Sequence, residues 1–334
     1  MTYNPAIYGV LIQWGERLFY PANRQVKSHT PRLSSTAGWA DHIRSRLEAT
    51  VRRAPQVMVK VTGGGRGMGA IAGHFRYISK NGQLNIEDDR GVVERGKEAL
   101  VEIERQWQFG GARIDTVSPR REAFNVMLSM PLGTDPLIVQ RAAREFAKIE
   151  FADHRYVMVL HDHQANPHVH LSVKAQSRHG QRLNPRKADL QRWRETFAYR
   201  LREWGVDAEA TRQATRGQQR SYPSLKRIKA QEKGVPSATT ATMRKPAGER
   251  FMRSHRLALE SWVRIMAALS QSAALADREL ASGIKQYINE MPFALDFHRS
   301  MQQQRPSPQR DLPGMQKVVT PTIERSRSAP DIER

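Results

Sequence analysis

Cysteine is absent from the 334 residues, and acidic side chains are scarce. Without cysteine there are no disulfides, thiolate metal sites, iron–sulfur clusters or cysteine nucleophiles, so a metal site has to use imidazole or oxygen ligands. The 33 Asp and Glu residues face 54 Lys and Arg residues, which gives a formal net charge of +21. A charge excess of this size predicts a polyanionic partner.

Long apolar runs are missing as well. No stretch reaches the roughly 18 uninterrupted apolar residues of a membrane helix, and residues 1–20 lack a basic-then-apolar signal pattern. We therefore expect no membrane insertion and a cytoplasmic location. The 39% hydrophobic and 26% charged residues are ordinary for a folded protein and argue against disorder of the whole chain.

Composition divides the chain into five predicted parts. Residues 211–250 contain ten Lys or Arg residues and two acidic ones, and residues 301–334 are rich in Pro, Ser, Gln and Arg. We predict an N-terminal accessory extension at 1–55, a main domain at 56–208, a basic linker or arm at 209–250, a small helical segment at 251–300 and a flexible tail at 301–334.

Apolar periodicity in the main domain predicts an α+β fold. The expected strands are 57–61, 124–130, 156–163 and 168–175. The expected helices are 68–80, 92–107, 137–151 and 187–204, with a further helix at 37–53 in the extension. The short connection between the last two strands predicts a hairpin, and hence a mainly antiparallel sheet of about five strands flanked by helices.

Six of the eleven histidines lie within residues 154–179. Side chains alternate along a strand, so His161 and His163 share one face of their strand, as His168 and His170 do on the next. A symmetric hairpin would pair His163 with His168 and His161 with His170, and all four rings would converge. This pattern predicts a metal or acid/base site, with Asp162 or Asp153 orienting an imidazole; a merely polar sheet surface is the alternative.

The segment 65–70 reads Gly-Arg-Gly-Met-Gly-Ala between a predicted strand and a predicted helix. It fits a dinucleotide fingerprint, with acidic residues at 87–89 at the required distance. A dinucleotide site leaves the basic charge and the histidines unexplained. We therefore favour a loop over the sheet, or a backbone cradle for a nucleic-acid phosphate at the helix N-terminus.

Tyr77 lies near the end of the helix that follows this loop. Its neighbours Arg76 and Lys80 would lower the cost of forming a phenolate, whose unperturbed pKa is about 10. A tyrosine half-buried against the sheet is the alternative interpretation.

Two motifs resemble a known family. The sequences R-Y-I-S-K-N-G-Q-L at 76–84 and H-D-H-Q-A-N-P-H-V-H at 161–170 are similar to those of the relaxases of mobilisable plasmids, most closely the subgroup with the T-DNA border endonuclease. The similarity extends from about residue 57 to 229, and T-R-G-Q-Q-R at 215–220 also resembles a family segment.

The resemblance implies a role for each matching residue. Tyr77 would be the nucleophile, and His161, His168 and His170 would hold a divalent metal ion, Mg²⁺ or Mn²⁺ in the family; imidazole donors alone also suit Zn²⁺. His163 stands where the family pattern has aspartate, so it or Asp162 would take the acid/base or orienting role. Lys174 stands where many members have asparagine.

The implied reaction is the nicking of single-stranded origin-of-transfer DNA through a 5′-phosphotyrosyl link. The implied partners are a relaxosome accessory protein and a type IV secretion coupling protein. Basic residues would bind the DNA backbone, and bases would stack on Trp193 or Trp204. The candidate DNA-binding residues are Arg66, Arg76, Lys80, Lys174, Arg186 and Lys187. A rolling-circle replication initiator and a non-catalytic DNA-binding accessory protein remain as alternatives.

Overall fold

The computed structural model describes residues 5–20, 36–164, 166–218 and 248–303. The strands are β1 (Met58–Gly63), β2 (Ile86–Asp88), β3 (Val93–Glu94), β4 (Ala123–Ser129), β5 (Tyr156–His161) and β6 (His168–Lys174). The helices are α1 (Pro5–Phe19), α2 (Thr36–Val51), α3 (Met68–Ile78), α4 (Lys97–Phe109), α5 (Pro136–Glu150), α6 (Lys187–Glu203), α8 (Glu249–Ser270), α9 (Leu275–Asn289) and α10 (Pro292–Gln303).

The six strands form one sheet in the order β1-β4-β6-β5-β2-β3, and every pair is antiparallel. The predicted α+β class is confirmed. The antiparallel order also rules out the parallel βαβ unit that a dinucleotide fingerprint requires. The predicted helix over 92–107 was wrong at its start, because Val93 pairs with Glu87 and α4 begins only at Lys97. Gly96, between β3 and α4, has φ +108°. Glycine adopts this backbone conformation readily and other residues rarely do, and the strand ends there.

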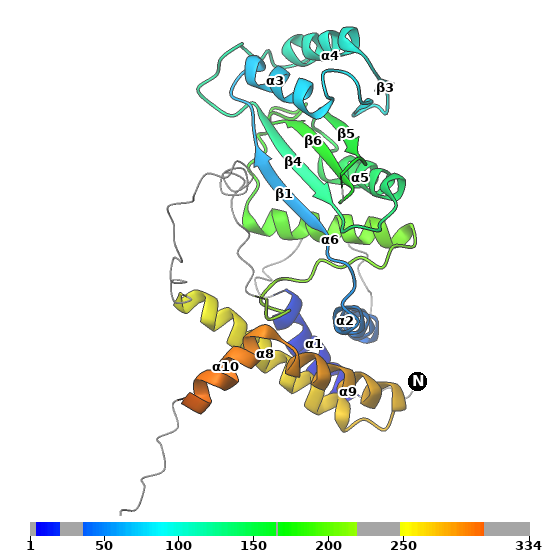
Figure 1. Cartoon of the computed structure of the whole chain (residues 1–334), viewed down its shortest axis with the longest axis vertical. Helices are drawn as coiled ribbons and strands as arrows, with labels where there is room; N and C mark the ends of the chain where they lie inside the picture. Colours follow the sequence, from blue (N-terminus) through cyan, green and yellow to red (C-terminus); the bar gives the residue numbers. More distant parts are fainter. Residues whose placement is uncertain (1–4, 21–35, 165, 219–247, 304–334) are drawn as a thin grey trace, which may run out of the picture. The chain divides into compact units, whose positions relative to one another are not determined.

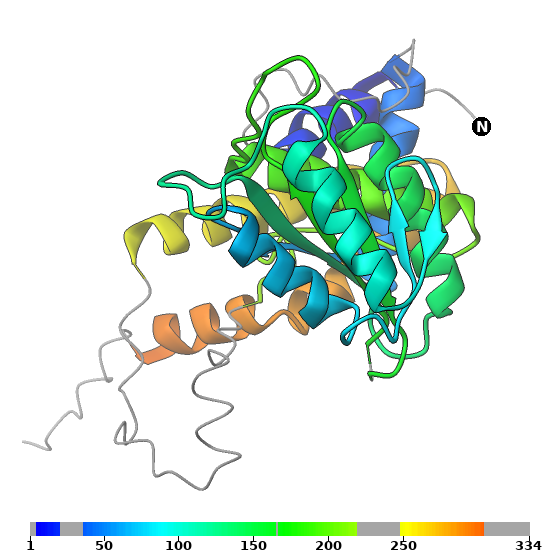
Figure 2. The same ribbon diagram turned by 90° about the horizontal axis from the view of Figure 1, so that it is seen from above.

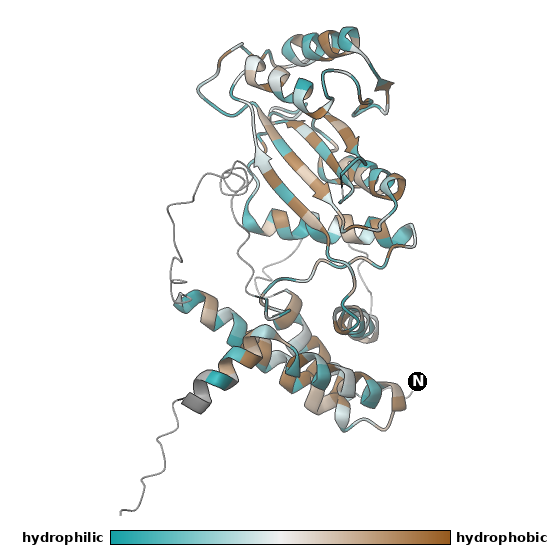
Figure 3. Ribbon diagram, in the orientation of Figure 1, coloured by the Kyte–Doolittle hydropathy of each residue, from teal (hydrophilic) through white to brown (hydrophobic). Residues whose placement is uncertain are grey.

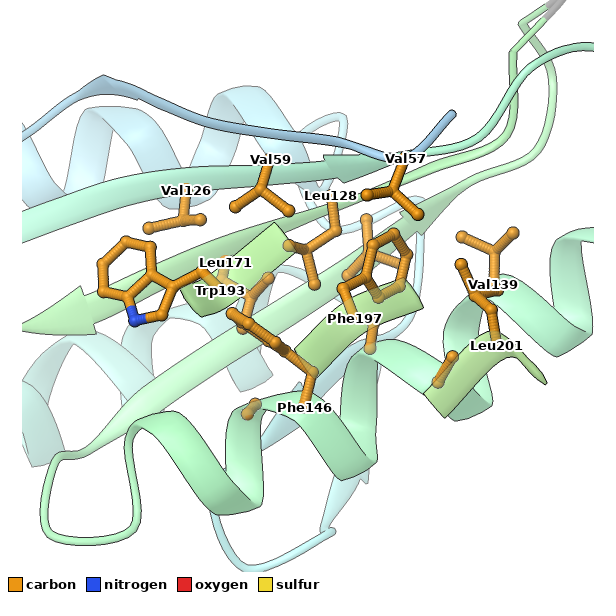
Figure 4. Close-up of a cluster of buried hydrophobic side chains, with 14 of the residues drawn as sticks. Val57, Val59, Val126, Leu128, Val139, Phe146, Leu171, Trp193, Phe197 and Leu201 are labelled. Atoms are coloured by element: carbon orange, nitrogen blue, oxygen red, sulfur yellow. The ribbon is translucent and has the colours of Figure 1, made fainter. Parts of the chain in front are cut away.

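Helices α5 and α6 cover one face of the sheet (Figure 1). Brown, apolar residues concentrate on the central strands (Figure 3). Val126, Leu128 and Leu171 point from the strands toward Phe146 of α5 and Trp193 of α6 (Figure 4). Because Trp193 is only 1% exposed within this core, the prediction that it stacks on DNA bases was wrong.

Helices α3 and α4 lie side by side over the other face (Figure 2). Phe75 of α3 meets Trp107 of α4 edge to face, with 4.9 Å between the ring centroids. Val157 and Val159 of β5 complete this second core from the sheet. Alternate residues of β5 and β6 point into the α5/α6 core, and the residues between them face α3 and α4. The histidines of these strands are on the α3/α4 face.

A third core joins helices from both ends of the described chain. It contains Leu11 and Leu18 of α1, Ile43 of α2, Trp262 of α8 and Ile284 of α9, each fully buried. Helix α1 packs on both α2 and α8, and α8 also packs on α9, so apolar faces distant in the sequence share one core. The helix at 37–53 was expected, whereas α1 was not.

A buried ion pair ties α2 to the segment that follows α6. Arg46 is 6% exposed and donates to Tyr20 Oη at 2.6 Å and to Glu209 Oε2 at 3.2 Å. Glu209 is 3% exposed and also accepts from the Thr211 hydroxyl. If one partner of a buried ion pair is removed, the other charge stays buried without compensation, which strongly destabilises the fold.

We expect Arg46→Ala to lower the free energy of unfolding by roughly 3–5 kcal/mol, because it leaves the Glu209 carboxylate buried without its main counter-ion. Urea denaturation of the full chain measures the change. Arg52→Ala is the matched control, since Arg52 pairs with Asp207 at the surface and both side chains are more than half exposed; its loss should cost about 0–1 kcal/mol. Equal effects of the two substitutions would contradict the importance of the buried pair.

None of the helices within the described ranges is long and apolar enough to cross a membrane. Most of the predicted basic arm and flexible tail, residues 219–247 and 304–334, falls outside those ranges.

Candidate active site

Three histidines converge where β5 ends and β6 begins. His161 lies directly opposite His168, and His170 lies opposite Val159. The ring centroids of the three histidines are 4.7–5.0 Å apart, and one ligand nitrogen from each lies within 4.8 Å of the others. Each residue is at most 9% exposed. The cluster can hold a metal ion.

The register differs from the predicted one. We expected His163 opposite His168, but His161 holds that position, a shift of 163 − 161 = 2 residues. Because the side-chain period of a strand is two, this shift keeps every histidine on its predicted face. It removes His163 from the ladder, since β5 ends at His161 and the connecting loop is longer than the predicted turn.

Backbone carbonyls orient two of the rings. His161 Nε2 donates to the Ile78 carbonyl at 2.7 Å, and His168 Nδ1 donates to the Asn166 carbonyl at 2.9 Å. Such carbonyls fix the tautomer of metal-binding histidines and leave the other ring nitrogen with a lone pair. Among the described residues, the buried Nδ1 atoms of His161 and His170 have no hydrogen-bond partner. These nitrogens fit a metal ion as their missing partner.

Burial favours the neutral form of the His161 and His170 imidazoles. Burial, with His161, His168 and His74 as smaller contributors, lowers the pKa of His170 to about 3. Burial also lowers the pKa of His161, although its hydrogen bond to Ile78 opposes the change. A metal ion binds neutral imidazole, so the lowered pKa values of His161 and His170 favour coordination near neutral pH.

Tyr77 lies beside the three histidines. It occupies the last turn of α3 and its side chain is 71% exposed. Its ring centroid is 6.5 Å from that of His170. The next residue, Ile78, supplies the carbonyl that binds His161, so one helical turn holds both the phenol and a histidine of the cluster. Tyr77 is not buried against the sheet as the alternative interpretation required.

His74 was missed by the sequence analysis. Its ring centroid is 6.2 Å from that of Tyr77 and 6.3 Å from that of His170. Burial lowers its pKa to about 4. The signal was its position three residues before Tyr77 in a predicted helix, which places both side chains on the same side.

Asp162 and His163 lie in the loop after β5. The Asp162 side chain is 61% exposed, and its Oδ1 is 4.0 Å from His163 Nδ1. The ring centroid of His163 is 5.1 Å from that of His161. His163 therefore lies next to the three-histidine cluster, but its ring nitrogens are not among the three that converge.

The predicted DNA-binding residues are dispersed. Arg76 and Lys80 flank Tyr77 on the surface, and Arg66 is exposed in the glycine loop. Arg186 and Lys187 are also exposed, but they begin α6, on the sheet face opposite the histidines. These last two do not join the histidine site.

Lys174 cannot serve as a surface contact for DNA, contrary to expectation. It is 4% exposed, and its Nζ donates to the carbonyls of Trp107, Gly110 and Ala112 at 2.8–3.2 Å. These carbonyls belong to the end of α4 and the loop after it. Lys174 thus caps a helix C-terminus, a position that favours a cation.

Backbone amides at the end of the glycine loop are hydrogen-bonded to another segment of the protein. The amides of Met68 and Gly69, which begin α3, donate to the carbonyls of Asp115 and Thr116. They are unavailable to a phosphate, so the predicted backbone cradle was wrong. Gly67 has φ +92°, and a Cβ there would lie 2.4 Å from the Thr116 carbonyl oxygen, which explains the glycine.

Comparison with known families agrees with this geometry. Residues 77–206 match the family model "Relaxase: MobA/VirD2-like, nuclease domain", a span that contains Tyr77 and all three clustered histidines. No curated protein matches the chain. Residues 77–206 therefore match a nuclease domain of the MobA/VirD2-like relaxase family.

Proposed function

We propose that this protein nicks single-stranded DNA at an origin of transfer by forming a covalent bond between Tyr77 and the DNA. The observation that carries the proposal is the exposed phenol of Tyr77 beside three converging imidazoles, with 6.5 Å between the rings of Tyr77 and His170. An exposed nucleophile next to a metal-binding cluster suits an attack on an anionic phosphodiester.

His161, His168 and His170 would hold a divalent metal ion. When bound, the ion supplies positive charge that polarises the scissile phosphate and offsets the charge of the transition state. The family resemblance implies Mg²⁺ or Mn²⁺, whereas three imidazole donors also suit Zn²⁺. Calorimetric titration with each ion tests which of them the cluster binds.

The proposed step exchanges one phosphodiester for another. The Tyr77 oxygen forms a bond to phosphorus, the bond from phosphorus to the 3′ oxygen breaks, and the phenol loses its proton while the 3′ oxygen gains one. The 5′ phosphate stays on Tyr77. Because the new bond is also a phosphodiester, the released 3′-hydroxyl can reverse the reaction and reseal the strand.

We assign the proton transfer to His163, with Asp162 as its orienting group. His163 borders the cluster, and its Nδ1 lies 4.0 Å from the Asp162 carboxylate. An imidazole can act as a general base and then as a general acid. In this role His163 replaces the aspartate of the family pattern.

The basic excess would bind the DNA strand. Arg76, Lys80 and Arg66 are exposed, and Arg76 lies on α3, the helix that carries Tyr77. Neutralising several phosphates gives strong, salt-dependent affinity that is independent of base sequence. In conjugative transfer, a relaxosome accessory protein would open the duplex and a type IV secretion coupling protein would receive the protein–DNA adduct.

Covalent trapping tests the proposal. The full chain is incubated with Mg²⁺ or Mn²⁺ and a single-stranded oligonucleotide library that has a randomised centre, and the products are separated under denaturing conditions. We expect a protein–DNA adduct, and sequencing of the attached DNA gives the nick position. DNA binding without any adduct would favour the non-catalytic accessory protein. A rolling-circle initiator would form the same adduct but would also start replication of a plasmid that carries its nick site.

A further inference from the structure

A groove lies between the end of α3 and the first turns of α4. Its volume is about 310 Å³, and it is lined by Arg76, Asn81, Lys97, Leu100, Val101 and Glu104. Leu100 is buried, whereas Val101 is 65% exposed. This volume is at the lower end of the range for small-ligand sites.

The groove and the histidines lie on opposite flanks of α3. His74 and Tyr77 are on the flank that approaches His170. Arg76 is on the other flank, where it reaches α4 and pairs with Glu104 at 3.1 Å. Successive helix residues are separated by about 100°, so Tyr77 and Arg76 lie on adjoining sides of α3. Arg76, the residue before Tyr77, lines the groove, so the groove borders the helical turn that carries the phenol.

The lining of the groove suits a nucleobase. The exposed side chain of Val101 offers an apolar surface to the face of a base, while Leu100 is 4% exposed and belongs mainly to the core. The pair of Arg76 and Glu104 places donors beside an acceptor, as base edges require. Lys97 at the rim is exposed and adds positive charge for the adjoining phosphate.

The turn after Tyr77 helps to shape the groove. Lys80 and Asn81 both have left-handed backbone conformations, with φ of 52° and 56°. Such conformations are costly for residues other than glycine and persist where the surrounding structure holds them. The Asn81 amide donates to the Arg76 carbonyl at 2.8 Å, which fixes Asn81 in the lining.

We propose that this groove binds the base of the first nucleotide on the 3′ side of the nick. This assignment rests on the proposed function, in which that nucleotide stays attached to Tyr77 through its 5′ phosphate. Tethering keeps its base near the end of α3, and the groove gives the base a fixed position. Binding there would favour one base at this position and would hold the adduct in place for resealing.

The test uses the oligonucleotide that forms the adduct and a version that is abasic at this first position. With the unchanged protein we expect the abasic version to lower the initial rate of adduct formation by about tenfold, the scale of one stacked base. Val101→Asp should cause a similar loss with the normal oligonucleotide. The abasic change should then add little, because both changes remove the same contact.

Val263→Asp is the matched control. Val263 lies on α8, outside the groove, and is 43% exposed, so its substitution should leave both rates unchanged. An adduct that forms equally well with and without the base would overturn this assignment alone. The assignment would also be overturned if Val101→Asp and the abasic site together lowered the rate by the product of their separate effects. No adduct with any oligonucleotide would overturn the proposed function and this assignment together.

Discussion

Tyr77→Phe is expected to abolish the covalent protein–DNA adduct. Phenylalanine lacks the oxygen that would join the phosphorus, and its neighbours cannot replace a missing nucleophile. Adduct formation should fall by a factor on the order of 10³ or more, as it does when a catalytic nucleophile is removed. The measurement is the rate of adduct formation on single-stranded DNA under denaturing separation.

Other properties of the Tyr77→Phe variant should change little. The side chain is 71% exposed, so loss of its hydroxyl disturbs little packing, and the melting temperature should stay the same. DNA binding in a gel-shift assay should persist, because it depends on Arg and Lys side chains. Tyr199→Phe on α6 is the matched control and should keep full activity. An adduct in Tyr77→Phe would assign the nucleophile to another residue.

His168→Ala is expected to remove metal binding and nicking together. The substitution takes away one of three converging nitrogens and the ring that the Asn166 carbonyl orients. Loss of an orienting group alone typically costs 10–100-fold in metal affinity, so loss of a ligand should cost more than about 100-fold. Calorimetric titration with Mn²⁺ and Zn²⁺ measures the affinity, and the trapping assay measures nicking.

A measurement of DNA binding distinguishes loss of the metal site in His168→Ala from a general loss of structure. His168→Ala should keep much of its affinity for single-stranded DNA, since the cluster does not supply the positive charge of the binding surface. His179→Ala is the matched control: its side chain is 72% exposed and lies 3.5 Å from Asp153, outside the cluster. Equal losses of binding and nicking in His168→Ala would contradict the proposed role of the cluster.

Local patterns in the sequence predicted the core of the candidate site well. Alternation along the strands identified the face of His161, His168 and His170, and this held although the register was shifted. The register itself depends on where β5 ends, and the sequence 161–168 does not reveal that point. Tyr77 was singled out by its basic neighbours and given the nucleophile's role by the family resemblance, but its distance from His170 depends on the packing of α3.

Long-range contacts were the features that the sequence could not predict. The role of Lys174 depends on the end of α4, more than sixty residues earlier in the chain. The glycine loop looked suitable for a phosphate until the segment around Thr116 was seen to occupy its amides. Likewise, neither α1 nor α8 carries a sign of its partner, because an apolar helix face does not specify what covers it.

The third core has a consequence for the order of folding during synthesis. Helices α1 and α2 leave the ribosome before the sheet does, but α8 and α9, which complete their core, come from residues 249–289. The sheet, from β1 to β6, is finished earlier and can fold by itself as synthesis continues. The part of the α1 and α2 surface that α8 and α9 cover therefore stays exposed until residues 249–289 have been made.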